Sequence, residues 1–90
     1  MREKRYTNSE LVKAHSYARK NRDSMLRSIS CGCFNCERIF MVNGIRDWIK
    51  EEDGGYTAIC PYCETDSVIG DDDVYPLKKD FLKQMKKYWY

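Results

Sequence analysis

The sequence predicts a small α+β domain, with a helix at each end and short strands around a cysteine-rich centre. Its 90 residues, of which 42% are hydrophobic, have the size and composition of one globular domain. Helical periodicity is confined to the two ends, and all five cysteines lie between them. We therefore expect a single domain over residues 1–90, with a helical arm at 1–30, a cysteine centre at 31–70 and a helix at 76–90.

The N-terminal helix is expected to run from about residue 8 to residue 28. Thr7 and Glu10 have the spacing of a capping box, which marks a helix start. One helical face then consists of Leu11, His15, Ala18, Arg22, Met25 and Ile29. Its two polar members leave two interpretations open. His15 and Arg22 either pack at the edge of the core or reach a partner, and His15 is also available as a spare metal ligand.

The central segment is expected to contain short strands, because apolar and β-branched residues cluster there between turn residues. The expected strands cover residues 38–42, 56–59 and 67–70. The first helix is expected to end at Cys31-Gly32-Cys33.

A short helix is expected between the first two strands. Asn43 would cap it, and Ile45, Trp48 and Ile49 would share one face. The glycines at residues 54–55 would end it, and residues 71–73 would form a solvated turn.

The C-terminal helix is expected to begin with Pro76 at its first position, where proline is favoured. Its apolar stripe comprises Leu77, Phe81, Met85, Tyr88 and Trp89, and its basic residues are Lys78, Lys79, Lys83, Lys86 and Lys87. We expect Phe40, Trp48, Trp89 and Tyr90 to belong to the core. The aromatic run at 88–90 leaves open a second interpretation, as an exposed anchor for a partner.

The cysteine spacing predicts a metal site. Cys33 and Cys36 form one CxxC pair, Cys60 and Cys63 form another, and twenty-three residues separate the pairs. Two such pairs are typical of a tetrahedral zinc site with four cysteine ligands. Because four thiolates leave no open coordination position, we expect one structural Zn²⁺ per chain and a zinc-ribbon-like fold with two zinc knuckles.

Cys31 is left over by this assignment. We expect it to be a small buried residue, and the alternative of a thiol that reacts or supports the metal ligands stays open. A ligand set with Cys31 and Cys33, leaving Cys36 free, is less consistent with the spacing of the second pair.

Three catalytic or redox classes fit the sequence poorly, so we expect no enzyme. The CPYC motif at residues 60–63 is like that of glutaredoxins, but the residues after it do not favour the required helix. Glu37 and Glu64 stand where rubredoxins usually have glycine. A zinc nuclease would need a histidine near the metal, and the single histidine, His15, precedes every cysteine.

The charge is distributed in three blocks. Residues 1–30 carry a net +5, residues 31–76 a net −7 and residues 77–90 a net +4. The favoured interpretation is attraction within the molecule between basic helices and an acidic centre. The alternative is a nucleic-acid surface formed by Arg19, Lys20, Arg22, Arg27, Lys79, Lys83, Lys86 and Lys87.

The cellular location is expected to be the cytoplasm. No apolar run reaches the length of a membrane span, and the N-terminus lacks the apolar region of a secretory signal. An odd number of cysteines also fits a disulfide framework poorly. We expect no membrane partner.

The motifs resemble a small bacterial family usually labelled only "cytoplasmic protein". The similar segments are Cys31-Gly32-Cys33-Phe34 with Cys36, Phe40, Ile45 with Trp48, Thr57-Ala58 with Cys60-Pro61 and Cys63, Asp66-Ser67-Val68-Ile69-Gly70, and Phe81-Leu82 with Met85, Trp89 and Tyr90. Glu64 departs from this family, which often has glycine there. The resemblance implies a zinc-bound cytosolic domain and no known activity. Several such proteins are carried by phages and mobile elements, which is consistent with binding a host protein.

The predicted function is that of a non-enzymatic protein-binding module stabilised by structural zinc. The candidate partner contacts are His15, Arg19, Arg22, Lys79, Lys83, Lys86 and Trp89. Nucleic-acid binding through the basic helices is the alternative. The sequence predicts no oligomeric state.

Overall fold

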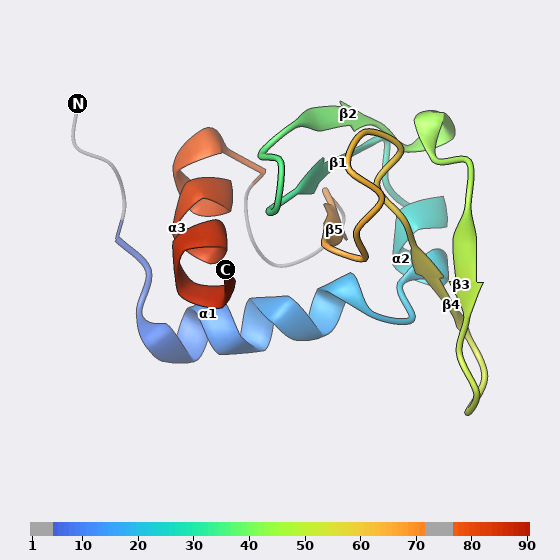
Figure 1. The fold of residues 1–90 in the computed structure, drawn as a ribbon, viewed down its shortest axis with the longest axis horizontal. Coiled ribbons are helices and arrows are strands. Elements are labelled where there is room, and N and C mark those ends of the chain that lie inside the picture. The colour runs from blue at the N-terminus through green and yellow to red at the C-terminus, as the bar shows by residue number, and fades with distance from the viewer. Residues whose placement is uncertain (1–4, 72–76) are drawn as a thin grey trace.

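The computed structural model describes residues 5–71 and 77–90 and has α+β architecture with a helix near each end (Figure 1). The helices are α1 (Asn8–His15), α2 (Arg22–Leu26) and α3 (Lys79–Trp89), with 3-10 turns η1 (Ser16–Ala18) and η2 (Val42–Gly44). The strands are β1 (Ser30–Cys33), β2 (Ile39–Met41), β3 (Trp48–Lys50), β4 (Tyr56–Ala58) and β5 (Val68–Gly70). The predicted fold class is confirmed.

The strands form two separate antiparallel sheets. One sheet has the order β2-β1-β5, and the other is the β3-β4 hairpin. In the first sheet Cys31 pairs with Gly70, and Cys33 pairs with Val68. No strand of the described residues belongs to both sheets, so other contacts must hold the two sheets together.

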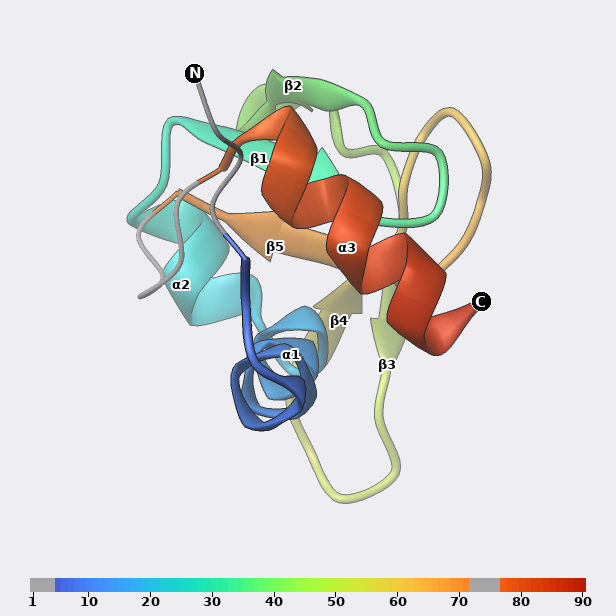
Figure 2. The ribbon, with the colours of Figure 1, turned by 90° about the vertical axis from the view of Figure 1, so that its left-hand side faces the viewer.

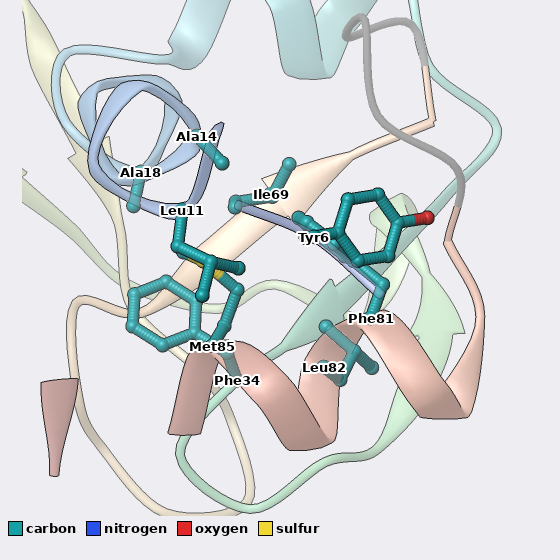
Figure 3. Close-up of a cluster of buried hydrophobic side chains, with 9 residues drawn as sticks. All are labelled: Tyr6, Leu11, Ala14, Ala18, Phe34, Ile69, Phe81, Leu82 and Met85. Atoms are coloured by element: carbon teal, nitrogen blue, oxygen red, sulfur yellow. The ribbon is translucent and has the colours of Figure 1, made fainter. Parts of the chain in front are cut away.

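Helix α3 crosses one face of the three-stranded sheet, and helix α1 packs beside α3 at the β5 edge of this sheet (Figure 2). They enclose the first hydrophobic core, drawn in Figure 3, which consists of Tyr6, Leu11, Ala14, Ala18, Phe34, Ile69, Phe81, Leu82 and Met85. Gly32 of β1 permits this close approach, because a Cβ atom there would lie 3.1 Å from a methyl carbon of Leu82. No cysteine belongs to this core.

A second core lies between α2 and the β3-β4 hairpin. It consists of Met25, Cys31, Cys33, Ala58, Cys60 and Val68, with Phe40, Val42, Ile45 and Trp48 packed against it. Cysteines supply half of its fully buried members. The packing of this region therefore depends on what the thiols bind.

The predicted N-terminal helix is interrupted. The capping box of Thr7 and Glu10 is confirmed, but α1 ends at His15 and α2 begins only at Arg22. Between them Lys20 has a left-handed backbone, with φ 52°. Because the helix breaks here, the Asn21 side chain hydrogen-bonds to both sheets, at the Val68 carbonyl of β5 and the Ala58 N–H of β4. These tertiary hydrogen bonds outweigh the helical periodicity of the sequence.

Two central predictions are wrong, whereas the three expected strands are confirmed as β2, β4 and β5. Residues 31–33 belong to the central strand β1 rather than to a helix end. The expected helix after Asn43 is replaced by η2 and β3, because β3 pairs with β4. Gly54 and Gly55 adopt positive φ and make the hairpin turn instead of ending a helix.

Helix α3 begins at Lys79, and the predicted role of Pro76 lies outside the described residues, as do residues 72 and 73 of the expected turn. Phe81 and Met85 are buried as expected, but Trp89 and Tyr90 are exposed by 37% and 61%. These two residues lie at the rim of the core rather than inside it. Among the described residues, no helix has the length and hydropathy of a membrane span.

Candidate metal centre

Four cysteine side chains converge at one point. The Sγ atoms of Cys33, Cys36, Cys60 and Cys63 all lie within 4.8 Å of one another. The Cys33 and Cys63 sulfurs are 3.5 Å apart, and those of Cys36 and Cys60 are 3.7 Å apart. A tetrahedral zinc with Zn–S bonds of about 2.3 Å places its sulfurs roughly 3.8 Å apart. These cysteines form no disulfide, and together they can hold a metal ion.

The two CxxC turns are built in the same way. In the first, the backbone N–H of Asn35 donates to Cys33 Sγ at 3.4 Å, and in the second the N–H of Tyr62 donates to Cys60 Sγ at 3.4 Å. Such bonds stabilise thiolates, which are the metal-binding form. The Cys33 N–H also bonds the Arg38 carbonyl at 2.9 Å, which closes the first turn. The Cys60 N–H closes the second turn on Thr65 at the same distance.

A residue in the left-handed conformation follows each pair. Glu37 has φ 63° and Glu64 has φ 62°, a region that glycine adopts without steric cost. The turn geometry is therefore kept although both residues are glutamates. Each glutamate carries a local backbone strain that the remaining contacts of the turn must offset.

Two polar side chains support the cluster and were missed by the sequence analysis. The Asn35 amide donates to Cys63 Sγ at 3.5 Å, and the Thr65 hydroxyl lies 3.1 Å from the same sulfur. Each side chain lies within two residues of a ligand cysteine in sequence. This proximity was the only sign in the sequence that Asn35 and Thr65 belong to the site. Their hydrogen bonds to Cys63 could not be predicted, because they depend on how the two turns meet.

Burial and hydrogen bonding oppose each other at the thiols. Burial raises the pKa of Cys33 and of Cys60, and the backbone N–H donors only partly offset this effect. Burial also acts on Cys63, but hydrogen bonds from Thr65 and Asn35 outweigh it and lower its pKa to about 6. Four thiolates at this depth require a compensating cation.

Cys31 lies outside the cluster. It is fully buried in the second core, and this burial raises the pKa of its thiol to about 12. These observations support its interpretation as a small core residue. The fold brings Cys36, and not Cys31, together with the other three cysteines.

His15 is not part of the cysteine cluster either. It is exposed on α1, and its ring contacts Trp89 with a centroid separation of 4.1 Å and Phe34 with one of 5.7 Å. The Trp89 indole N–H donates to the Leu11 carbonyl at 3.2 Å. The structure thus brings together two of the seven candidate partner contacts, at the junction of α1 and α3.

The other candidate contacts are basic residues, and most of them bond acidic or carbonyl groups of the centre. Arg19 pairs with Glu51 at 3.4 Å, and its neighbour Lys20, which is not one of the seven, pairs with Asp53. Lys86 lies 4.0 Å from the Glu37 carboxylate, and Lys79 donates to the Glu37 carbonyl at 2.8 Å. These contacts agree with attraction within the molecule.

Arg22 and Lys83 have different surroundings. The Arg22 guanidinium lies over the ring of Tyr56 at 4.9 Å and over that of Trp48 at 5.8 Å. Lys83 lines a pocket of about 240 Å³ with Arg5, Gln84 and Lys87.

Comparison of the chain with family models found no match, and neither did its comparison with curated proteins or with solved structures.

Proposed function

We propose that this protein is a non-enzymatic protein-binding module whose fold is stabilised by one structural zinc ion at Cys33, Cys36, Cys60 and Cys63. The convergence of four sulfurs within 4.8 Å, from two turns of the same construction, supports the zinc part of this proposal. One turn follows β1 and the other follows β4, so an ion there would connect the two sheets.

The chemistry of the donors supports zinc in a structural role. A tetrahedral set of four thiolates selects zinc or iron, and zinc requires no redox partner. Four protein ligands leave no position for a water molecule or a substrate, which distinguishes structural from catalytic sites. Five free cysteines also favour a compartment that keeps thiols reduced, in agreement with the expected cytoplasmic location.

The surface chemistry favours a protein partner over nucleic acid. The ion pairs of Arg19 and Lys20 with the β3-β4 hairpin neutralise basic groups that a phosphate backbone would need. Large apolar side chains are exposed as well, among them Leu26, Ile29 and Met41. Contacts of this kind dominate protein interfaces more than nucleic-acid interfaces.

Nucleic-acid binding remains the alternative proposal, and one observation favours it. Arg5, Lys83 and Lys87 line a single pocket beside α3. If phosphate groups bind there, the affinity of the protein for DNA or RNA should fall steeply as salt is added.

Native mass spectrometry of the protein, gently purified from its own source, tests both proposals together. We expect one zinc ion per chain and a co-purifying protein. Nucleic acid that salt releases would support the alternative. A chain that carries no metal would contradict the zinc proposal directly.

Two cysteine variants test the ligand set. We expect Cys60→Ser to lower the zinc content and to destabilise the fold, because binding at such sites contributes on the order of 10 kcal/mol to folding. Cys31→Ser should keep its zinc, since Cys31 lies outside the cluster. Metal analysis and thermal unfolding measure both effects. Loss of zinc from the Cys31 variant would show that the ligand set is wrong.

A further inference from the structure

An apolar groove is lined by residues of α2, the end of β2, η2 and β3. The ribbon in Figure 1 shows α2 and β3 at the same end of the molecule. The volume of the groove is about 420 Å³, and its lining consists of Met25, Leu26, Ser28, Ile29, Met41, Val42, Asn43 and Trp48. None of these side chains is charged. The groove is distinct from the cysteine cluster, although Val42 and Trp48 pack against the core that contains the cysteines.

The groove walls expose unusually large apolar groups. Ile29 is exposed by 72%, Leu26 by 70% and Met41 by 52%. Single exposed apolar side chains are common, but several that line one concavity are typical of interaction sites. Three different segments contribute them, so the local sequence of no single helix or strand accounts for the cluster.

The groove is held in shape by Asp71. Its carboxylate accepts hydrogen bonds from the backbone N–H groups of Ile29 and Ser30, at 3.2 and 2.9 Å, and from the Ser30 hydroxyl at 3.0 Å. These bonds fix the segment that carries Ile29 and lower the pKa of Asp71. These hydrogen-bond donors also stabilise the negative charge of the Asp71 carboxylate.

One arginine, Arg22, lies at the rim of the groove. The Arg22 guanidinium lies over the ring of Trp48, which lines the groove. Arg22 forms no ion pair with a carboxylate in the described part of the chain, whereas Arg19 and Lys20 do. A stacked guanidinium keeps its donors available for a carboxylate.

We propose that this groove binds a segment of a partner protein that carries apolar anchor residues flanked by acidic side chains. The inference rests on the proposed function and names its surface. Apolar anchors would fill the space between Leu26, Ile29 and Met41, and a carboxylate would pair with Arg22. A second copy of this chain fits less well, since a symmetric interface would bring Arg22 from both copies.

Selection from a random peptide library displayed on phage tests the proposal. The zinc-loaded full chain serves as bait, and the selected peptides are then synthesised and titrated into isotope-labelled protein by NMR. We expect peptides with apolar residues next to Asp or Glu, and chemical-shift changes centred on Leu26, Ile29 and the Trp48 indole.

Surface variants locate the site. Ile29→Ser should weaken binding by about tenfold or more, because one buried aliphatic anchor contributes that much. Val12→Ser is the matched control, since Val12 is also apolar and 48% exposed but lies on α1, outside the groove lining.

Arg22→Glu tests the charge. It should weaken binding of acidic peptides and strengthen binding of peptides whose acidic residues are replaced by lysine. Ile29 and Arg22 are both exposed, so the variants at these positions should stay folded and keep their zinc.

The outcomes separate this proposal from the proposed function. Selected peptides that bind elsewhere, or whose affinity is the same for Ile29→Ser as for the native protein, would overturn the groove and leave the protein-binding function standing. Failure to enrich any peptide would count against both. Concentration-dependent dimerisation that Ile29→Ser abolishes would assign the groove to a second copy and overturn the acidic partner.

Discussion

At the scale of single residues, Glu64 occupies a position whose backbone favours glycine. Its φ of 62° is left-handed, and it directly follows the metal-ligand candidate Cys63. The Glu64 N–H still donates to the Cys60 carbonyl at 2.9 Å, so the turn is complete despite the side chain. The Cβ atom is therefore the source of strain, because a left-handed L-residue brings Cβ close to a carbonyl oxygen.

We expect Glu64→Gly to be more stable than Glu64→Ala by about 1 kcal/mol. Both substitutions remove the same carboxylate, so they differ only in the Cβ atom at a left-handed position. Urea unfolding of the two zinc-loaded variants measures the difference. Equal stability would show that the turn relaxes around a Cβ atom without cost.

Single residues also show what the sequence could predict about the site. The clustering of Cys33, Cys36, Cys60 and Cys63 was predictable, because CxxC spacing lets the two sulfurs of a local turn meet one ion. Asn35 and Thr65 were not, since their bonds to Cys63 form only when the two turns face each other. The exposure of Ile29 was also missed, because its place on the expected helical face indicated burial.

At the scale of elements, the break between α1 and α2 joins the two sheets. The Asn21 amide nitrogen donates to the Val68 carbonyl of β5 at 2.7 Å, and its oxygen accepts from the Ala58 N–H of β4 at 3.0 Å. Helical periodicity continues through this region, so the sequence pattern alone could not reveal the break. The segment at 45–49 was misassigned for a related reason, since a short apolar run fits a helix or a strand and only pairing with β4 decides.

We expect Asn21→Ala to destabilise the zinc-loaded protein by about 3 kcal/mol, because a buried N–H and a buried C=O each lose a partner. Asn43→Ala is the matched control. Asn43 is exposed on η2, so its loss should change stability by less than about 0.5 kcal/mol. Urea unfolding compares the two variants, and a similar small effect for both would mean that Asn21 is not a link between the sheets.

At the scale of the whole molecule, the two cores differ in their cysteine content. The core under α1 and α3 contains no cysteine, whereas half of the buried members of the core between α2 and the β3-β4 hairpin are cysteines. The candidate ligands also come from the end of β1 and from the turns that follow β1 and β4, which are strands of different sheets. Without an ion, the four clustered thiols would lack a shared partner in the second core, whereas the first core contains no thiol.

We therefore expect chelation of the metal to act unequally on the two cores. After EDTA treatment under reducing conditions, amide hydrogens of β3 and β4 should lose their protection from exchange, because the cysteines of the second core would no longer be joined through an ion. Amides of α3 around Phe81 and Met85 should keep more of theirs, since Leu11, Phe34 and Ile69 still cover them. Hydrogen exchange by NMR, with zinc added back as the control, measures both regions in one sample. Equal loss of protection in both would mean that the ion supports the fold as one cooperative unit, and that the cysteine-free core cannot persist without it.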